Sequence, residues 1–180
     1  MPDTFIPTKK LPKKITKTRL RNIAMFYLER FESSEANLRD VLRRRILKYK
    51  STTEKDFDAA QAFDWVEEII TDFVRLNYLN DERFAEMKIN DYLSAGKPER
   101  YIKLKLKQKG IDENTTDKIL QQKEFSPFEM ALHFAKKKKI GAFCENSEKR
   151  KENRQKDLGK LVRAGFDYDT ALQVIDFEEE

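Results

Sequence analysis

Residues 106–112 read Leu-Lys-Gln-Lys-Gly-Ile-Asp, and residues 161–167 read Leu-Val-Arg-Ala-Gly-Phe-Asp, at an offset of 55 positions. The same offset places the pair Ile119-Leu120 on Val174-Ile175. Each copy has a leucine that seats a helix, a glycine that ends it, an apolar residue that covers the corner and an aspartate that caps the next helix. Two copies of one helix–turn–helix pattern predict tandem helical repeats.

Apolar residues at helical spacing predict further helices on both sides of these turns. Such stripes run through residues 20–31, 38–49, 62–73, 85–93, 101–106, 131–135, 158–162 and 168–175. Ser34, Asn80 or Asp81, and Ser126 are candidate N-caps. The first third shows the same order of helices, with a longer second connection at 51–58 and no glycine.

We therefore expect an all-α fold of tandem three-helix, helix-turn-helix-like repeats that form an elongated, curved array. The expected division is a disordered basic N-terminal arm at 1–16, followed by repeats at 17–78, 79–123 and 124–180. One segment conflicts with this reading, because Ile-Lys-Leu-Lys-Leu-Lys at 102–107 alternates as a strand does. The stretch from Pro98 to Gly110 is longer than a typical strand, so we predict a helix there.

Composition supports the helical prediction and excludes several classes of function. The chain has 180 residues, of which 38% are charged, with five glycines and five prolines, too few for a β-protein with frequent turns. Its longest apolar run, 23–28, is far too short to span a membrane, and no secretory signal precedes it. A single cysteine, Cys144, excludes a disulfide framework, so we expect a cytosolic, cytoplasmic protein.

The sequence shows no arrangement typical of an active site. It has no glycine-rich phosphate loop and no nucleophile elbow, and its one histidine, His133, is expected on a helix surface. Acidic pairs such as Glu67-Glu68 are explained by helix caps and solvated faces, because nothing nearby completes a metal cage. We expect no catalytic residues, no metal and no cofactor, which leaves binding as the function.

Basic residues are concentrated in blocks that alternate with acidic stretches. The net charge is +6 over residues 1–21, +5 over 39–50, +5 over 97–109 and +7 over 136–163. A solvated helix face explains any single block equally well, but three blocks at similar places in a repeat predict a basic surface for phosphates or for an acidic protein. Lysine and arginine spread along the second helix of each unit favour phosphate contact over base reading. The candidate basic face comprises Arg39, Arg43, Arg44, Lys103, Lys107, Lys160 and Arg163.

Several short motifs, in order along the chain, resemble the bacterial RecX family of regulatory proteins. They are Tyr27-Leu28 with Arg30, Ser34 and Leu38; Tyr-Leu-Asn-Asp at 78–81 with Phe84-Ala85; Leu106 with Lys109-Gly110-Ile111; and Leu161 with Gly165-Phe166. The resemblance covers nearly everything after residue 20. The chain has Phe31 where the family usually has a second arginine, and Asn37 where it usually has a glutamate.

This resemblance implies a modulator of the recombinase RecA that is not an enzyme. Family members are similar to curved arrays that lie in the groove of RecA–single-stranded DNA filaments. They inhibit ATP hydrolysis, strand exchange and cleavage of the SOS repressor, either by blocking filament growth or by promoting disassembly. The implied partners are the RecA filament and single-stranded DNA, with no membrane and with the chain as a monomer.

Two other functions fit the residues. An autonomous single-stranded DNA-binding protein would compete with RecA for DNA without sequence preference, and a purely structural adaptor would use no nucleic acid at all. Salt dependence separates the first from a filament-binding protein, because each phosphate contact with a single strand adds about −0.7 to the slope of log affinity against log salt.

Overall fold

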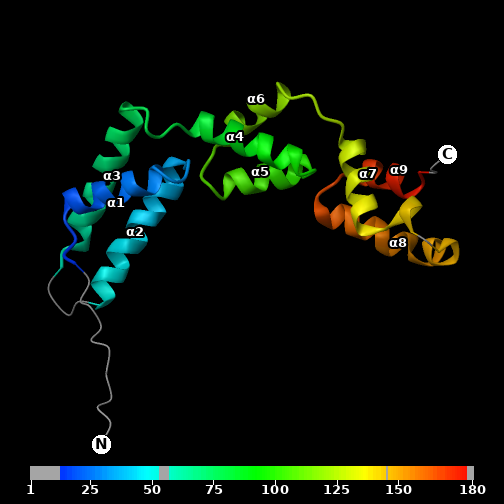
Figure 1. Ribbon diagram of the computed structural model, residues 1–180, viewed down its shortest axis with the longest axis horizontal. Coiled ribbons are helices and arrows are strands. Elements are labelled where there is room, and N and C mark those ends of the chain that lie inside the picture. The colour runs from blue at the N-terminus through cyan, green and yellow to red at the C-terminus, as the bar shows by residue number, and fades with distance from the viewer. Residues whose placement is uncertain (1–12, 53–56, 145, 178–180) are drawn as a thin grey trace, which may run out of the picture. The chain divides into compact units, whose positions relative to one another are not determined.

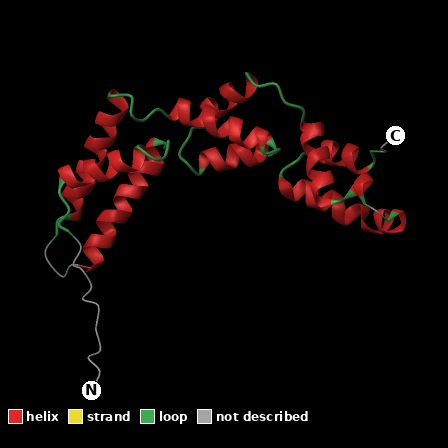
Figure 2. Cartoon of the chain, in the orientation of Figure 1, coloured by secondary structure: helices red, strands yellow, loops and turns green. Residues whose placement is uncertain are grey.

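The protein is described by a computed structural model that covers residues 13–52, 57–144 and 146–177. Within these ranges the chain forms nine α-helices and one short 3-10 helix, and no strand (Figure 1; Figure 2). The predicted all-helical fold is confirmed. The helices are α1 (Lys17–Leu28), α2 (Glu35–Thr52), α3 (Ala59–Arg75), α4 (Asp81–Ser94), α5 (Glu99–Lys107), α6 (Glu113–Gln121), α7 (Pro127–Lys138), η1 (Gly141–Phe143), α8 (Ser147–Ala164) and α9 (Tyr168–Ile175).

The chain divides into two compact units, Met1–Asn80 and Asp81–Glu180. The first unit holds one hydrophobic core, built by α1 to α3. The second holds two, one built by α4 to α6 and one by α7 to α9, with Leu93 and Phe125 at the edge of both. Three cores agree with three repeats, while the predicted repeat bounds and the curved array stay predictions.

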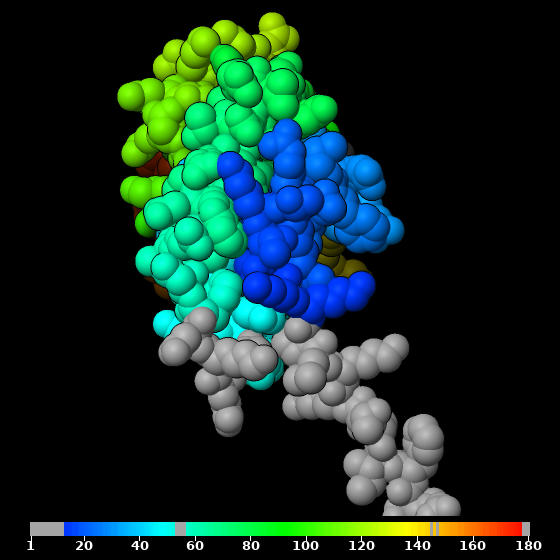
Figure 3. Space-filling view, turned by 90° about the vertical axis from the view of Figure 1, so that its left-hand side faces the viewer, coloured from blue at the N-terminus to red at the C-terminus, as the bar shows by residue number. Residues whose placement is uncertain are grey.

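In the first unit, α3 supplies the most regular apolar stripe. Asp58 caps this helix by accepting a hydrogen bond from the backbone N–H of Gln61 at 3.0 Å. Residues Ala62, Val66, Ile69 and Phe73 then recur at helical spacing and are fully buried. Figure 3 shows the side of this unit on which α1 (dark blue) lies along α3 (blue-green).

Ion pairs fix the direction in which α1 meets α3. Lys17 pairs with Glu68, and one turn later Arg21 Nη1 lies 3.1 Å from Asp72 Oδ2. Both pairs span 51 residues, so the two helices run in the same direction where they touch. These pairs are half-exposed and add little stability beside the core between them.

The disputed segment 102–107 lies within α5 and is helical, as predicted. Ile102 and Leu106, four residues apart, are buried, whereas Leu104 is 54% exposed. Leu104 was expected in the buried stripe, and that prediction is wrong because a residue two positions from Ile102 lies about 200° around a helix from it. The alternation therefore gives one apolar face and one isolated exposed leucine.

Both repeated turns have the hydrogen bonds of a Schellman motif. The Gly110 N–H donates to the Lys107 carbonyl at 3.0 Å and the Ile111 N–H to the Leu106 carbonyl at 3.1 Å. The turn at 161–167 repeats both bonds, at 3.0 and 3.2 Å. The glycines have φ of 78° and 109°, in the region that favours glycine. The predicted role of glycine in these turns is confirmed.

The aspartates after these turns cap α6 and α9, as predicted. Asp112 accepts from the backbone N–H of Asn114 at 2.8 Å and of Thr115 at 3.2 Å. Asp167 accepts from the backbone N–H of Thr170 at 2.8 Å and from its hydroxyl at 2.6 Å. The hydroxyl of Thr115 likewise donates to Asp112. The two repeats of the second unit thus share one capping geometry.

The structure departs from the sequence-based expectations near the ends of two helices. α2 continues through Ser51 and Thr52, whose hydroxyls donate to the Lys48 carbonyl at 3.0 and 2.7 Å, so the polar connection starts later than predicted. Phe31, expected in the buried stripe, is 57% exposed because α1 ends at Leu28. Residues 1–12 of the predicted disordered arm lie outside the described residues, and Ile15 is buried in the core.

Candidate functional site

The seven residues of the predicted basic face lie on the second helix of each group, α2, α5 and α8. Their surroundings differ from one helix to the next. On α2, Arg39 Nε lies 2.8 Å from Glu67 Oε2, and Arg43 Nη2 lies 3.0 Å from Glu67 Oε1. The Arg43 guanidinium also lies over the ring of Phe63. Arg39 and Arg43 therefore share one carboxylate on α3, which neutralises part of their charge.

Arg44 is the exposed member of the α2 group. Its Nε donates to the Asp40 carbonyl of its own helix at 3.2 Å. Arg45 and Lys48 are exposed on the same helix. The charge available on α2 for a partner thus centres on Arg44 and its neighbours, and less on Arg39, which is held against α3.

On α5, Lys103 is held by two carboxylates. Its Nζ lies 2.7 Å from Glu99 Oε1 and 2.8 Å from Asp117 Oδ1 of α6. Hydrogen bonds to Asp117 and then to Glu99 raise the pKa of the Lys103 amine far above its usual value, so it stays charged. This lysine bridges α5 to α6, and its charge is largely compensated within the fold.

Two cations on the same face of α5 are more available than Lys103. Arg100 and Lys107, seven residues apart, are exposed and make no hydrogen bond or ion pair with a described residue. With Lys103 they line a cavity of about 280 Å³ between α5 and α6. Leu104, Ile111, Thr116 and Glu113 complete its wall. Sequence reasoning missed Arg100, although its spacing from Lys107 places the two side chains on one helix face.

On α8, Lys160 has a structural partner. Its Nζ lies 2.8 Å from Asp157 Oδ1, and the side chain of Asp157 is only 5% exposed. The 55-residue offset places Asp157 on the buried Ile102, so the third group has an acid at a core position. Removal of Lys160 would leave this buried carboxylate without its cation, which is costly. Its role is therefore structural at least in part.

The predicted basic face does not recur in register between α5 and α8. The offset places Lys103 on Leu158, which is buried, and Lys107 on Val162, which is partly buried. Conversely, Lys160 and Arg163 match Lys105 and Gln108. The two helices therefore present their cations from different faces relative to the shared turn, although the number of basic residues is similar.

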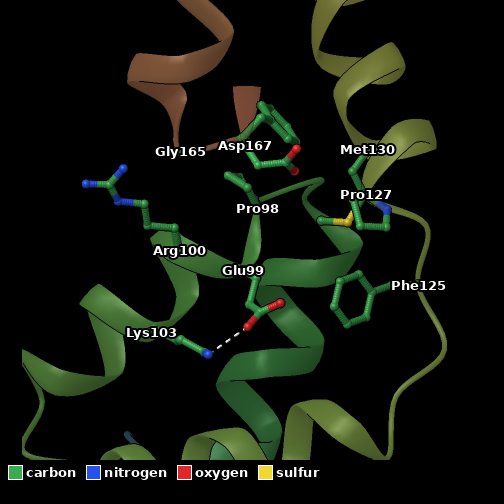
Figure 4. A pocket seen from close by; sticks show the side chains of 10 residues that line it. Pro98, Glu99, Arg100, Lys103, Phe125, Pro127, Met130, Gly165 and Asp167 are labelled. Carbon is green, nitrogen blue, oxygen red and sulfur yellow. Dashed lines mark ion pairs between the residues drawn. The ribbon is translucent and has the colours of Figure 1, made fainter. Parts of the chain in front are cut away.

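A second cavity, of about 400 Å³, lies where α5, α7 and the corner between α8 and α9 meet within the second unit (Figure 4). Its wall is mainly apolar, with Pro98, Phe125 and Met130 among its residues. Figure 4 shows the Glu99–Lys103 ion pair at its edge. A Cβ on Gly165 would lie 3.2 Å from Pro98 Cγ, so glycine lets the corner approach the start of α5.

The described residues show no site for metal chemistry or membrane insertion. No group of three or more metal-binding side chains is found among them. None of their helices combines the length and the apolar character needed to span a bilayer. His133 is exposed on α7, where the sequence predicted a surface histidine.

Comparison with known proteins identifies the family. Residues 80–120 match the family model for the second three-helix domain of RecX, which covers α4 to α6. The chain is 36% identical to the regulatory protein RecX of Myxococcus xanthus, over 93% of this chain and 89% of that protein. It is 29% identical to the protein of the same name from Agrobacterium fabrum, over 86% and 80% of the two chains.

Solved structures agree on the fold. The crystal structure of RecX from Lactobacillus salivarius superposes with a TM-score of 0.63 at 24% identity, over 88% of this chain and 94% of that one. A second crystal structure of a regulatory protein RecX gives a TM-score of 0.64 at 23% identity, over 89% and 72%. The helices, the repeated turns and the near full-length relatives lead to one conclusion: the chain belongs to the RecX family of regulatory proteins, which are not enzymes.

Proposed function

We propose that this chain regulates a RecA recombinase by binding RecA filaments on single-stranded DNA and inhibiting their ATPase, recombinase and coprotease activities, and thereby modulates DNA repair and the SOS response. Membership of the RecX family carries the proposal, since the match to the Myxococcus xanthus protein spans 93% of the chain. The exposed cations on α2, α5 and α8 support it, because they suit the phosphates of DNA within a filament.

The cations divide into structural and available ones. Lys103 and Lys160 are paired with carboxylates inside the fold, whereas Arg100 and Lys107 are exposed on one face of α5. A filament would meet Arg100 and Lys107 without first breaking an ion pair. We therefore place the main contribution of α5 in these two side chains, with Lys103 fixing the helix that carries them.

The central experiment is a titration of the protein into RecA that hydrolyses ATP on excess single-stranded DNA. Inhibition well below one molecule per RecA, with free DNA abundant, is expected because each bound molecule would act on a filament rather than on one subunit. Inhibition only when the protein suffices to cover the DNA would contradict the proposal and favour an autonomous DNA-binding protein that competes with RecA.

Paired variants test the assignment on α5. Arg100→Gln with Lys107→Gln should weaken binding to RecA–DNA filaments by about tenfold, because two charge-assisted contacts are lost. Lys151→Gln with Lys156→Gln removes the same charge from exposed positions on α8 and is the matched control. Equal losses in both double variants, measured by filament co-sedimentation, would show that net charge and not this face controls binding.

A further inference from the structure

Gly159 occupies an unusual position in the interior of α8. Glycine is the least favourable residue in a helix interior apart from proline, so a glycine there calls for a physical reason. A Cβ at this position would have three atoms of the Arg163 guanidinium group as its nearest neighbours, with Nη1 at 3.1 Å and Cζ and Nη2 at 3.7 Å. The space that a methyl group would take is filled by the Arg163 head group, four residues ahead.

The folded-back guanidinium of Arg163 lies beside a groove between α7 and α8. This groove, of about 410 Å³, is lined by Phe134 and Lys138 from α7 and by Lys160, Arg163 and Ala164. Phe134 is fixed from behind by Phe166, with ring centroids 5.8 Å apart. The groove thus combines three cations with an aromatic floor.

The charge in this groove is not neutralised by its own wall. No carboxylate lines it, whereas each of the two cavities beside α5 includes one. Lys160 is already paired with Asp157. Lys138 and Arg163 make no hydrogen bond or ion pair with a described residue, so two full positive charges face the groove from opposite helices.

We propose that Lys138 and Arg163 bind a phosphate of a single-stranded nucleic acid backbone in this groove, and that Gly159 is a positioning residue for Arg163. The planar guanidinium offers two parallel donors to a phosphate, and the lysine adds a mobile point charge from the other helix. Without a side chain at Gly159, Arg163 lies flat on α8. The site extends the proposed function, on which it rests for its biological setting, by naming DNA itself as a ligand.

The surrounding charge favours a polyanion over a carboxylate on a protein surface. Residues 136–163 carry a net charge of +7, and Lys136, Lys137 and Lys139 continue the basic surface at the end of α7. A nucleic acid strand places one phosphate at every nucleotide and can follow such a surface beyond a single groove. A single protein carboxylate would satisfy the groove and leave the other cations unmatched.

The test measures affinity for a fluorescent oligo-dT strand by anisotropy, with the full chain and no RecA. Lys138→Gln with Arg163→Gln should weaken binding at least tenfold and make the salt slope shallower by about 1.4, the value for two lost contacts. The exposed pair Lys151→Gln with Lys156→Gln removes the same charge from α8 and should change affinity less than threefold.

Gly159→Ala separates positioning from folding. Alanine should raise the melting temperature by about 2–4 °C, because it favours the helix and meets only a flexible side-chain end. The same methyl group should weaken binding to the strand by about three- to tenfold, because it displaces Arg163. A more stable protein that binds less well is a result that damage to the fold cannot produce.

Three outcomes would overturn the proposal. Gly159→Ala might leave affinity unchanged, which would remove Gly159 and the placed guanidinium from the site. The control pair might lose as much affinity as the groove pair, which would make binding a matter of diffuse charge. Loss of filament binding by the groove variant with unchanged affinity for the naked strand would assign the groove to an acidic protein. Because RecA is absent from the main assay, failure of the proposed function would leave this result readable.

Discussion

Lys139 follows the last residue of α7 with a φ of 52°, in the left-handed region where side chains are strained. Its N–H donates to the Lys136 carbonyl at 3.2 Å, and the Ile140 N–H donates to the Ala135 carbonyl at 3.1 Å. Gly96 makes the corresponding bonds after α4, with a φ of 65°. The same turn is therefore built with glycine in one group of helices and with lysine in the next.

Lys139→Gly should raise the free energy of unfolding by about 0.5–1 kcal/mol, because glycine adopts the left-handed conformation without a Cβ clash. Urea unfolding followed by circular dichroism measures the change. Lys139→Ala keeps the Cβ and removes the same charge, so it should give no gain. Equal stabilisation by both variants would attribute the effect to relief of charge repulsion along 136–139.

Single residues that act on their neighbours along the chain could be predicted from sequence. The caps at Asp112 and Asp167 and the turns at Gly110 and Gly165 depend on local backbone geometry, and all four are confirmed. Pairings across helices could not be predicted. The bridge from Lys103 to Asp117 of α6 depends on how α5 packs on α6, which no local pattern encodes.

At the scale of the helix, the two aspartate caps make stability depend on pH. Hydrogen bonds from Thr115 and Thr170 hold the pKa of Asp112 and Asp167 below the usual value of 3.8. The folded chain therefore binds fewer protons at these groups than the unfolded chain. Their contribution is present above that value and is lost as the pH falls through the lowered pKa.

Asp112→Asn with Asp167→Asn should make the melting temperature less sensitive to acid, because the asparagines can cap but cannot titrate. The measurement compares melting temperatures of the parent and the double variant from about pH 6 to about pH 2.5. The parent should lose more stability than the variant over this range. Parallel curves would show that other carboxylates control the acid response.

Helix existence followed from apolar spacing, whereas helix faces and ends depended on packing. Segment 102–107 is helical as predicted, but only packing shows that Ile102 and Leu106 are buried and Leu104 is not. The basic face shows the same division. Its members were placed on the correct helices, yet the missed Arg100 and Lys138 became visible only when neighbouring helices enclosed cavities around them.

At the scale of the whole molecule, the division into Met1–Asn80 and Asp81–Glu180 predicts two unfolding units. Leu42→Ala, at a fully buried position of the first unit, should lower the stability of that unit by about 2–5 kcal/mol. The sole tryptophan, Trp65, lies in the first unit, so its fluorescence reports on that unit alone. Circular dichroism follows the helices of both units.

The fluorescence transition of Leu42→Ala should move to lower urea while a second transition in circular dichroism keeps its midpoint. Leu106→Ala is the matched control in the second unit and should move only the dichroism transition. A single shift shared by both probes in either variant would show that the chain unfolds as one cooperative body.

The repeated turns and the cations around them occupy different positions of the 55-residue repeat. Leu106 and Gly110 match Leu161 and Gly165, whereas the cations of α5 match apolar or uncharged residues of α8. Such an arrangement separates the part of each repeat that specifies the backbone from the part that sets its electrostatic character. The scaffold is therefore modular in the engineer's sense: charge can be moved around one helix without rewriting the corner that follows it.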